Sequence, residues 1–258
     1  MAAEAGYTMA LTQSFRDSGP KRRPPARSLG ASRGRVGLTP SARSLFASAK
    51  RLFDSGSDLR DYRSGFELLK RAAKMGHPGA HEWLGAVYDY GLGTRPSRRL
   101  AFEHYKVAGD AGLANAEYHV GIFYQQGRGV EKDDRAAVKW LRRAARHGDA
   151  TAVYWIGQCY LHGRGVAKNE QKGFMLELES ANRGVVEAQY SVGVCYEQGQ
   201  GVSRDFENAF AWFLRAAKRG NGDAARAIGR FYEDGRGRKA NRDRAEYWYA
   251  RAHGNSTD

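Results

Sequence analysis

The sequence has few of the features that mark secreted, disulfide-stapled or membrane-spanning proteins. It contains two cysteines and six prolines among 258 residues, so no disulfide framework is available. Its mean hydropathy is −0.67, and no apolar run approaches the ~20 residues that a membrane span needs. The N-terminus lacks the basic-then-apolar pattern of a secretory signal. We therefore expect a cytoplasmic protein, with organelle import or secretion as an effector, through a basic N-terminal arm, as alternatives.

Positive charge is in excess. The chain has 42 basic and 28 acidic residues, a formal net charge of +14, which favours acidic partners such as nucleic acid, an anionic membrane or an acidic protein face. Residues 1–39 hold seven basic residues against two acidic ones and show no helical period. They are interpreted as a disordered basic arm. Its role stays open between a nuclear-type basic patch, an electrostatic tether, a weak organelle presequence and a solvated tail.

The dominant feature is an internal repeat. Five columns of identical residues recur every 36 positions through five copies without an insertion. These columns run from Ala80 to Ala224, Gly85 to Gly229, Tyr88 to Tyr232, Gly91 to Gly235 and Gly93 to Gly237. Self-similarity at a fixed period of this length is the signature of a repeat architecture.

A sixth, degenerate copy precedes these five. Residues 40–75 lack the glycines but keep Asp61 and Ala72 in register with the later copies. The predicted units are 40–75, 76–111, 112–147, 148–183, 184–219 and 220–255. The first unit is interpreted as a cap, because a terminal repeat must differ from inner repeats where it meets water.

Each unit is expected to form two helices. The first runs from about the Gly76-type position to the Tyr88-type position and is stopped by the G-x-G pair, because glycine adopts the left-handed conformation found at helix C-termini. The second begins at a column of N-capping residues and ends at the next unit's glycine. That column consists of Asp61, Ser97, Asp133, Asn169, Asp205 and Asn241. Small residues at the Gly85 and Ala144 columns are expected to let helices approach closely.

One helix pair cannot bury its apolar face alone, whereas stacked neighbours share a continuous core. The sequence therefore predicts an all-α fold, an α/α superhelical solenoid of six 36-residue helix–turn–helix repeats. The stretches AEYHVGIFYQQGRGV at 116–130 and AVKWLRRAARHG at 137–148 resemble the Sel-one-like repeat, a relative of the tetratricopeptide repeat. The resemblance is strong over 76–255 and weak over 40–75. It implies an adaptor or scaffold that holds partner proteins.

The resemblance also implies that the first helices line a concave face. Placing Ala116 on the core side puts other first-helix positions on that face at about 100° per residue. The predicted partner-binding residues are Tyr118, Ile122, Tyr154, Gln158, Leu161, Tyr190 and Val194, with Trp83 and Trp155 at the edge. Aromatic side chains are frequent anchors in such grooves. The alternative is that the tyrosines serve packing, and that the tryptophans seal contacts between repeats.

Other suggestive residues favour structural roles. Trp140, Trp212 and Trp248 are expected in the core, and the G-R-G triplets at 127–129, 163–165 and 235–237 are expected to be turns. His77 and His81 have a zinc-compatible spacing but no third ligand. Cys159 and Cys195 lie on apolar helix faces and are interpreted as inert thiols. No catalytic arrangement, metal site or cofactor motif can be assembled, so we do not expect an enzyme.

The sequence thus predicts a non-catalytic scaffold that binds a protein partner, through an acidic or extended segment, on the concave face. The alternative is a nucleic-acid or anionic-surface binder that uses the net charge of +14. It ranks second because the basic residues are expected to scatter over outer helix faces with no interleaved aromatic patch. These residues are Arg142, Arg143, Arg146, Lys218 and Arg219.

Overall fold

The structure, a computed structural model, describes residues 40–55 and 59–254. The predicted basic arm, residues 1–39, lies outside the described residues. Within those ranges all regular secondary structure is helical and amounts to 12 helices. The helices form six consecutive pairs, which confirms the predicted α/α repeat solenoid. The chain divides into two compact units, one up to Asn115 and one from Ala116.

The first unit contains two helix pairs. These are α2 (Pro40–Ser55) with α3 (Leu59–Lys74), and α4 (Pro78–Tyr90) with α5 (Arg98–Asp110). Helix α3 packs on α4, so the second helix of one pair contacts the first helix of the next. The core between them includes Phe53, Leu69, Trp83 and Leu84. This contact joins the degenerate first pair to the second.

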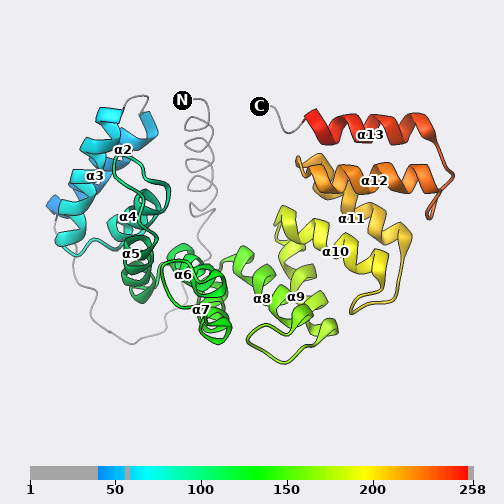
Figure 1. Cartoon of the computed structure of the whole chain (residues 1–258), viewed down its shortest axis with the longest axis horizontal. Coiled ribbons are helices and arrows are strands. Elements are labelled where there is room, and N and C mark those ends of the chain that lie inside the picture. The colour runs from blue at the N-terminus through cyan, green and yellow to red at the C-terminus, as the bar shows by residue number, and fades with distance from the viewer. Residues whose placement is uncertain (1–39, 56–58, 255–258) are drawn as a thin grey trace. The chain divides into compact units, whose positions relative to one another are not determined.

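The second unit contains four helix pairs, the first of which begins at the unit boundary. They are α6 (Ala114–Gln126) with α7 (Asp134–Arg146), α8 (Ala150–His162) with α9 (Glu170–Asn182), α10 (Val186–Gln198) with α11 (Phe206–Lys218), and α12 (Gly222–Asp234) with α13 (Arg242–Gly254). Each second helix again packs on the following first helix. Figure 1 shows the pairing plainly for α12 and α13, which lie side by side at the C-terminal end of the chain.

Glycine conformation fixes the helix ends as the repeat pattern predicts. Gly91, Gly163, Gly199 and Gly235 end first helices in the left-handed conformation, with φ between 69° and 75°. The second glycine of a triplet serves a different purpose. Gly165 has φ +67°, and a Cβ there would fall on the carbonyl oxygen of Asp134. A side chain at this position is therefore excluded by both conformation and space.

The predicted capping column is confirmed for most second helices. Side-chain oxygens of Ser97, Asp133, Asn169 and Asp205 accept from backbone N–H groups in the first turn, and Asn241 accepts from Arg244 N at 2.8 Å. The prediction is wrong for Asp61, because α3 begins earlier, at Leu59. A second set of caps starts first helices and was not predicted: His77, Asp149 and Asn221.

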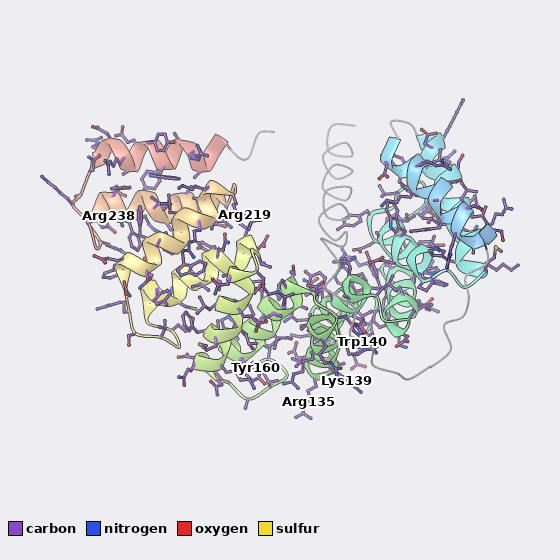
Figure 2. The ribbon with its side chains drawn as sticks, turned by 180° about the vertical axis from the view of Figure 1, so that it is seen from behind. Arg135, Lys139, Trp140, Tyr160, Arg219 and Arg238 are labelled. Carbon is purple, nitrogen blue, oxygen red and sulfur yellow. The ribbon has the colours of Figure 1, made fainter. Side chains whose placement is uncertain are left out.

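Arginines join neighbouring pairs of the second unit. Arg183, at the end of α9, donates to the carbonyl of Gly148, and Arg219 (labelled in Figure 2), at the end of α11, donates to that of Gly184. In both cases the acceptor lies one repeat earlier in the chain. The arginine therefore satisfies a carbonyl at a helix C-terminus that has no partner inside its own helix.

Candidate partner-binding surface

The three predicted tyrosines are half-buried at the first-helix positions of the second unit. Tyr118, Tyr154 and Tyr190 each pack against a different hydrophobic cluster. The ring centroid of Tyr190 lies 5.6 Å from that of Phe213, and that of Tyr154 lies 5.6 Å from Trp155 in an edge-on arrangement. Each tyrosine thus contributes to packing and still presents part of its surface. Both of the roles considered for these residues are compatible with that position.

The predicted exposure is wrong for three residues. Ile122 and Leu161 are 7% and 2% exposed, and Trp83, in the first unit, is 7% exposed. Leu161 packs directly against Gly173 of α9, and Trp83 contacts the rings of Phe46 and Phe53. Ile122 packs among residues of α7 and α8, and Leu161 among residues of α9 and α10. The buried arc of a first helix is therefore wider than a single core stripe. These three residues are core.

The remaining predicted residues keep partial exposure. Gln158 and Val194 are half-buried on α8 and α10, and Trp155 packs on the cluster around Ile156 with part of its surface open. The surface that remains available on these two helices consists of Tyr154, Gln158, Tyr190 and Val194. We call this set the α8–α10 surface.

A buried acid that the sequence analysis missed lies beneath this surface. The side chain of Glu177 on α9 is 0% exposed. It occupies a column that is apolar or aromatic in every other repeat: Leu69, Tyr105, Leu141, Phe213 and Tyr249. Its Cγ approaches the glycine of α8 at position 157, as its column equivalents approach theirs. The comparison of columns is the signal that could have found it.

Glu177 closes a ring of hydrogen bonds with two polar residues of the first helices. Gln158 Nε2 donates to Glu177 Oε1 and, at 3.1 Å, to Ser191 Oγ. Ser191 Oγ in turn donates to Glu177 Oε2 at 2.7 Å, and the Cys195 thiol donates to the same oxygen at 3.6 Å. Because a carboxylate only accepts, the ring fixes the amide of Gln158 with its nitrogen inward. Its carbonyl oxygen is the atom that remains to accept from another molecule.

The pKa values of the ring residues are set mainly by burial, because no cation of the described residues lies next to the Glu177 carboxyl group. All the hydrogen-bond partners of Glu177 are neutral, and burial raises the pKa of its carboxyl group, opposed by the bonds from Ser191 and Gln158. Burial, followed by the nearby Glu177, raises the pKa of Tyr154 to about 12. Burial also raises the pKa of the Cys195 thiol, with Glu177 adding to the effect. The tyrosine and the cysteine are therefore neutral at physiological pH and act as hydrogen-bonding groups.

A second buried acid makes a useful contrast. The Glu117 side chain on α6 is 0% exposed and bonds the guanidinium of Arg143 at 2.9 Å and the ring of His147 at 2.7 Å. The Arg143 guanidinium also lies 4.2 Å from the Trp140 ring centroid. Glu117 thus has a cationic partner in Arg143 and ties α6 to α7. This pairing is structural, and it corrects the expectation that Arg143 belongs to the outer face.

The other candidates take structural positions. Cys159 and Cys195 are free and buried, and burial raises the pKa of Cys159 to about 11. His77 Nδ1 accepts from Ala80 N as the cap of α4, while His81 Nδ1 lies 3.0 Å from His104 Nδ1. No group of three or more potential metal ligands lies together in the ranges 40–55 and 59–254. Trp140 and Trp212 are buried as predicted, and Trp248 is half-buried.

Comparison with known proteins identifies the repeat. The family model described as the Sel1 repeat matches residues 42–77, 78–113, 114–149, 150–185, 186–221 and 222–252. Among solved structures, a Sel1 repeat protein from Oxalobacter formigenes is 28% identical, with a TM-score of 0.73, over 82% of each chain. A protective antigen with an SLR fold from uropathogenic Escherichia coli is 26% identical with a TM-score of 0.72; the match covers 83% of this chain and 46% of that one.

More distant structures share the fold alone. The immunity protein PA5088 from Pseudomonas aeruginosa is 21% identical, with a TM-score of 0.59, and the match covers 86% of this chain and 84% of that one. A search of curated proteins gave no significant match. No helix within the described residues is both long enough and apolar enough to span a bilayer.

Proposed function

The chain belongs to the Sel1 repeat family, whose repeats generally mediate protein–protein interactions, and on this premise we propose that it is a non-catalytic scaffold that binds an extended protein segment on the α8–α10 surface. The family is a repeat scaffold and generally non-enzymatic. We take the partner to be a protein and confine the contact to the residues of the α8–α10 surface.

The observation that carries the proposal is the buried Glu177 ring. Placing a carboxylate in a core column without a cation costs free energy, and an apolar residue would be the stabilising choice there. The five equivalent positions hold such residues. A local rule that is broken at one repeat only is expected at a functional position rather than a purely structural one. What the ring provides is a Gln158 amide held in one orientation.

The chemistry of the surface suits a peptide in extended conformation. The Gln158 carbonyl oxygen can accept from a backbone N–H of the partner, since both hydrogens of its amide are used inside the ring. Tyr154 lies one turn before Gln158 on α8 and Tyr190 lies on α10, and both can contact side chains that alternate along the peptide. Fixing these groups before binding reduces the entropy lost on association.

Site-specific photo-cross-linking tests the proposal. A benzophenone side chain placed at Tyr154 should trap a discrete protein partner in cells that express the full chain. The same group placed at Met175, on α9 and 58% exposed, is the control. Equal cross-links from Met175, or none from Tyr154, would remove the α8–α10 surface as the binding site.

A further inference from the structure

Four cations form a stripe on the exposed side of α7. Arg135, Lys139, Arg142 and Arg146 are all exposed, and at about 100° per residue they fall within about 60° of the helix circumference. Their spacing of four, three and four residues corresponds to about 16 Å along the helix axis. Figure 2 shows Arg135 and Lys139 on α7, next to Trp140. We infer that this stripe binds an acidic segment of a protein partner.

At the equivalent positions of α5, basic and acidic residues alternate and form ion pairs, which is the arrangement that stabilises a helix. There, Arg99 pairs with Glu103 at 3.0 Å and Lys106 with Asp110 at 2.9 Å, each at i and i+4. On α7 the same columns are all basic. Like charges at i and i+4 destabilise a helix by a few tenths of a kcal/mol per pair. The α7 sequence thus bears a small cost that the α5 sequence avoids.

Two acids at the start of α7, Asp133 and Asp134, are already engaged. Asp134 is the only acidic residue of α7, and its Oδ2 lies 3.8 Å from Lys132 Nζ. Asp133 caps the helix by accepting from the N–H groups of residues 135 and 136. None of the four stripe residues forms an ion pair in the part of the chain that the structure describes. Their charge is therefore available to an outside partner.

The aromatic residues beside the stripe are covered by cations. Arg142 donates to the Tyr160 hydroxyl at 2.9 Å, and Lys172 Nζ lies 4.4 Å from the Tyr160 ring centroid. Arg143 covers Trp140, which is itself 9% exposed. The expectation of basic residues without aromatic neighbours is therefore wrong for α7. Trp140 is buried and Lys172 already covers the Tyr160 ring, which leaves little aromatic surface on which nucleic-acid bases could stack.

The width of the charged surface also favours a protein segment. On α9 the four equivalent columns hold only uncharged residues: Gln171, Met175, Leu178 and Asn182. The stripe of four cations is thus confined to α7, with Lys172 of α9 beside Arg142 at the Tyr160 ring. This narrow stripe suits a single acidic segment better than the two phosphate backbones of a duplex. Carboxylates that recur every three or four residues on a partner helix would match the spacing of the stripe. The inference rests on the proposed scaffold function in taking the partner to be a protein, but it concerns a separate surface.

The test uses the full chain and a fluorescein-labelled polyglutamate peptide long enough to span the four cations. The variant Lys139→Glu with Arg146→Glu gives α7 the alternating charge pattern of α5. At physiological ionic strength, where charges beyond about 8 Å are largely screened, we expect anisotropy titration to show binding about ten-fold weaker than wild type. The melting temperature should be unchanged or higher, because two i, i+4 pairs replace like charges.

The charge-matched control is Lys239→Glu with Arg251→Glu, two exposed residues of the last repeat of the second unit. It changes the net charge equally and should leave peptide binding within about two-fold of wild type, since charges three repeats further along the same unit are screened at α7. Equal losses in both variants, or no peptide binding by the wild-type chain, would overturn the inference. A double-stranded RNA of the same length as the peptide is titrated in parallel. If it bound more tightly than the peptide and lost affinity in the Lys139→Glu, Arg146→Glu variant, the choice of a protein segment would be wrong.

A milder variant and the separate cross-linking experiment make the result interpretable if the charge reversal disturbs folding. If the reversal disturbs folding, Lys139→Gln with Arg146→Gln removes the two charges without adding acids, and a loss of about three-fold is expected in the same titration. Unchanged binding in this milder variant would also overturn the inference. Cross-linking from Tyr154 does not involve α7, so failure of the stripe and failure of the proposed function give different results.

Discussion

Glu177 and Ser191 are joined by a hydrogen bond of 2.7 Å that links the second helix of one repeat to the first helix of the next. The five equivalent positions of the other repeats hold apolar or aromatic residues. The hydrogen bond belongs to the ring that orients Gln158 beneath the α8–α10 surface. The junction between α9 and α10 therefore contains a buried carboxyl group, and it lies under the surface that we assign to partner binding.

Stability should depend on pH through this junction. Burial raises the pKa of Glu177 above its usual value near 4.5, so the folded chain holds this proton more tightly than the unfolded chain does. The stabilising contribution of the protonated group is complete below that value and is lost as pH rises through the raised pKa.

The variant Glu177→Leu restores the residue type of the column and cannot titrate there. We expect its melting temperature to exceed that of wild type by more at pH 7 than at pH 4.5. Thermal unfolding of both chains across this interval is the measurement. A constant difference between the two chains would show that Glu177 has the same proton affinity in the folded and unfolded states.

The second glycine of a G-x-G turn, such as Gly165, packs on the previous repeat, and replacing it should lower the free energy of unfolding more than replacing other glycines. Gly165→Ala places a methyl group on the Asp134 carbonyl in addition to requiring φ +67°, and should cost about 3 kcal/mol of unfolding free energy. Gly148→Ala is the matched control, since Gly148 has φ +97° with nothing within 4 Å of the added carbon. It should cost only about 1 kcal/mol.

Chemical denaturation, monitored by helical circular dichroism, measures both glycine variants. Equal effects would mean that backbone conformation alone, and not contact between repeats, selects glycine at position 165.

The buried ion pair of α6 should matter more than the exposed pairs. Glu117→Gln removes the charge that Arg143 and His147 contact, and should cost about 3 kcal/mol because it leaves the Arg143 charge partly buried without its partner. Glu103→Gln breaks the exposed pair with Arg99 and should cost less than about 1 kcal/mol. Comparable losses from the two substitutions in denaturant titrations would contradict this account.

Much of the fold could be predicted because the repeat averages over local ambiguity. One copy of a column such as Gly91 or Asp133 is weak evidence, whereas several copies in register define where helices stop and start. The predictions failed where a residue's surroundings come from two neighbouring elements at once. Ile122 and Leu161 face solvent on a helical wheel with a single core stripe, but neighbouring helices bury them.

The candidate site was less accessible from the sequence for a related reason. Tyr154, Gln158 and Tyr190 could be selected as first-helix residues, but the ring beneath them comes from α8, α9 and α10 together. Taken alone, Glu177 looks like an ordinary charged residue on a helix surface. Comparison with the equivalent residues of the other repeats shows that its position is a core position. The α7 stripe was likewise hidden, since four cations on one helix are unremarkable until α5 shows the same columns paired.

The most direct test of the scaffold account is the affinity of the Glu177→Leu chain for the partner segment trapped from Tyr154, measured by titration calorimetry. The account predicts binding about ten-fold weaker than wild type, from a chain at least as stable at pH 7, because Gln158 loses its fixed orientation while the core gains an apolar residue. Unchanged affinity in the Leu variant would show that the buried acid has no part in recognition and would contradict the central claim.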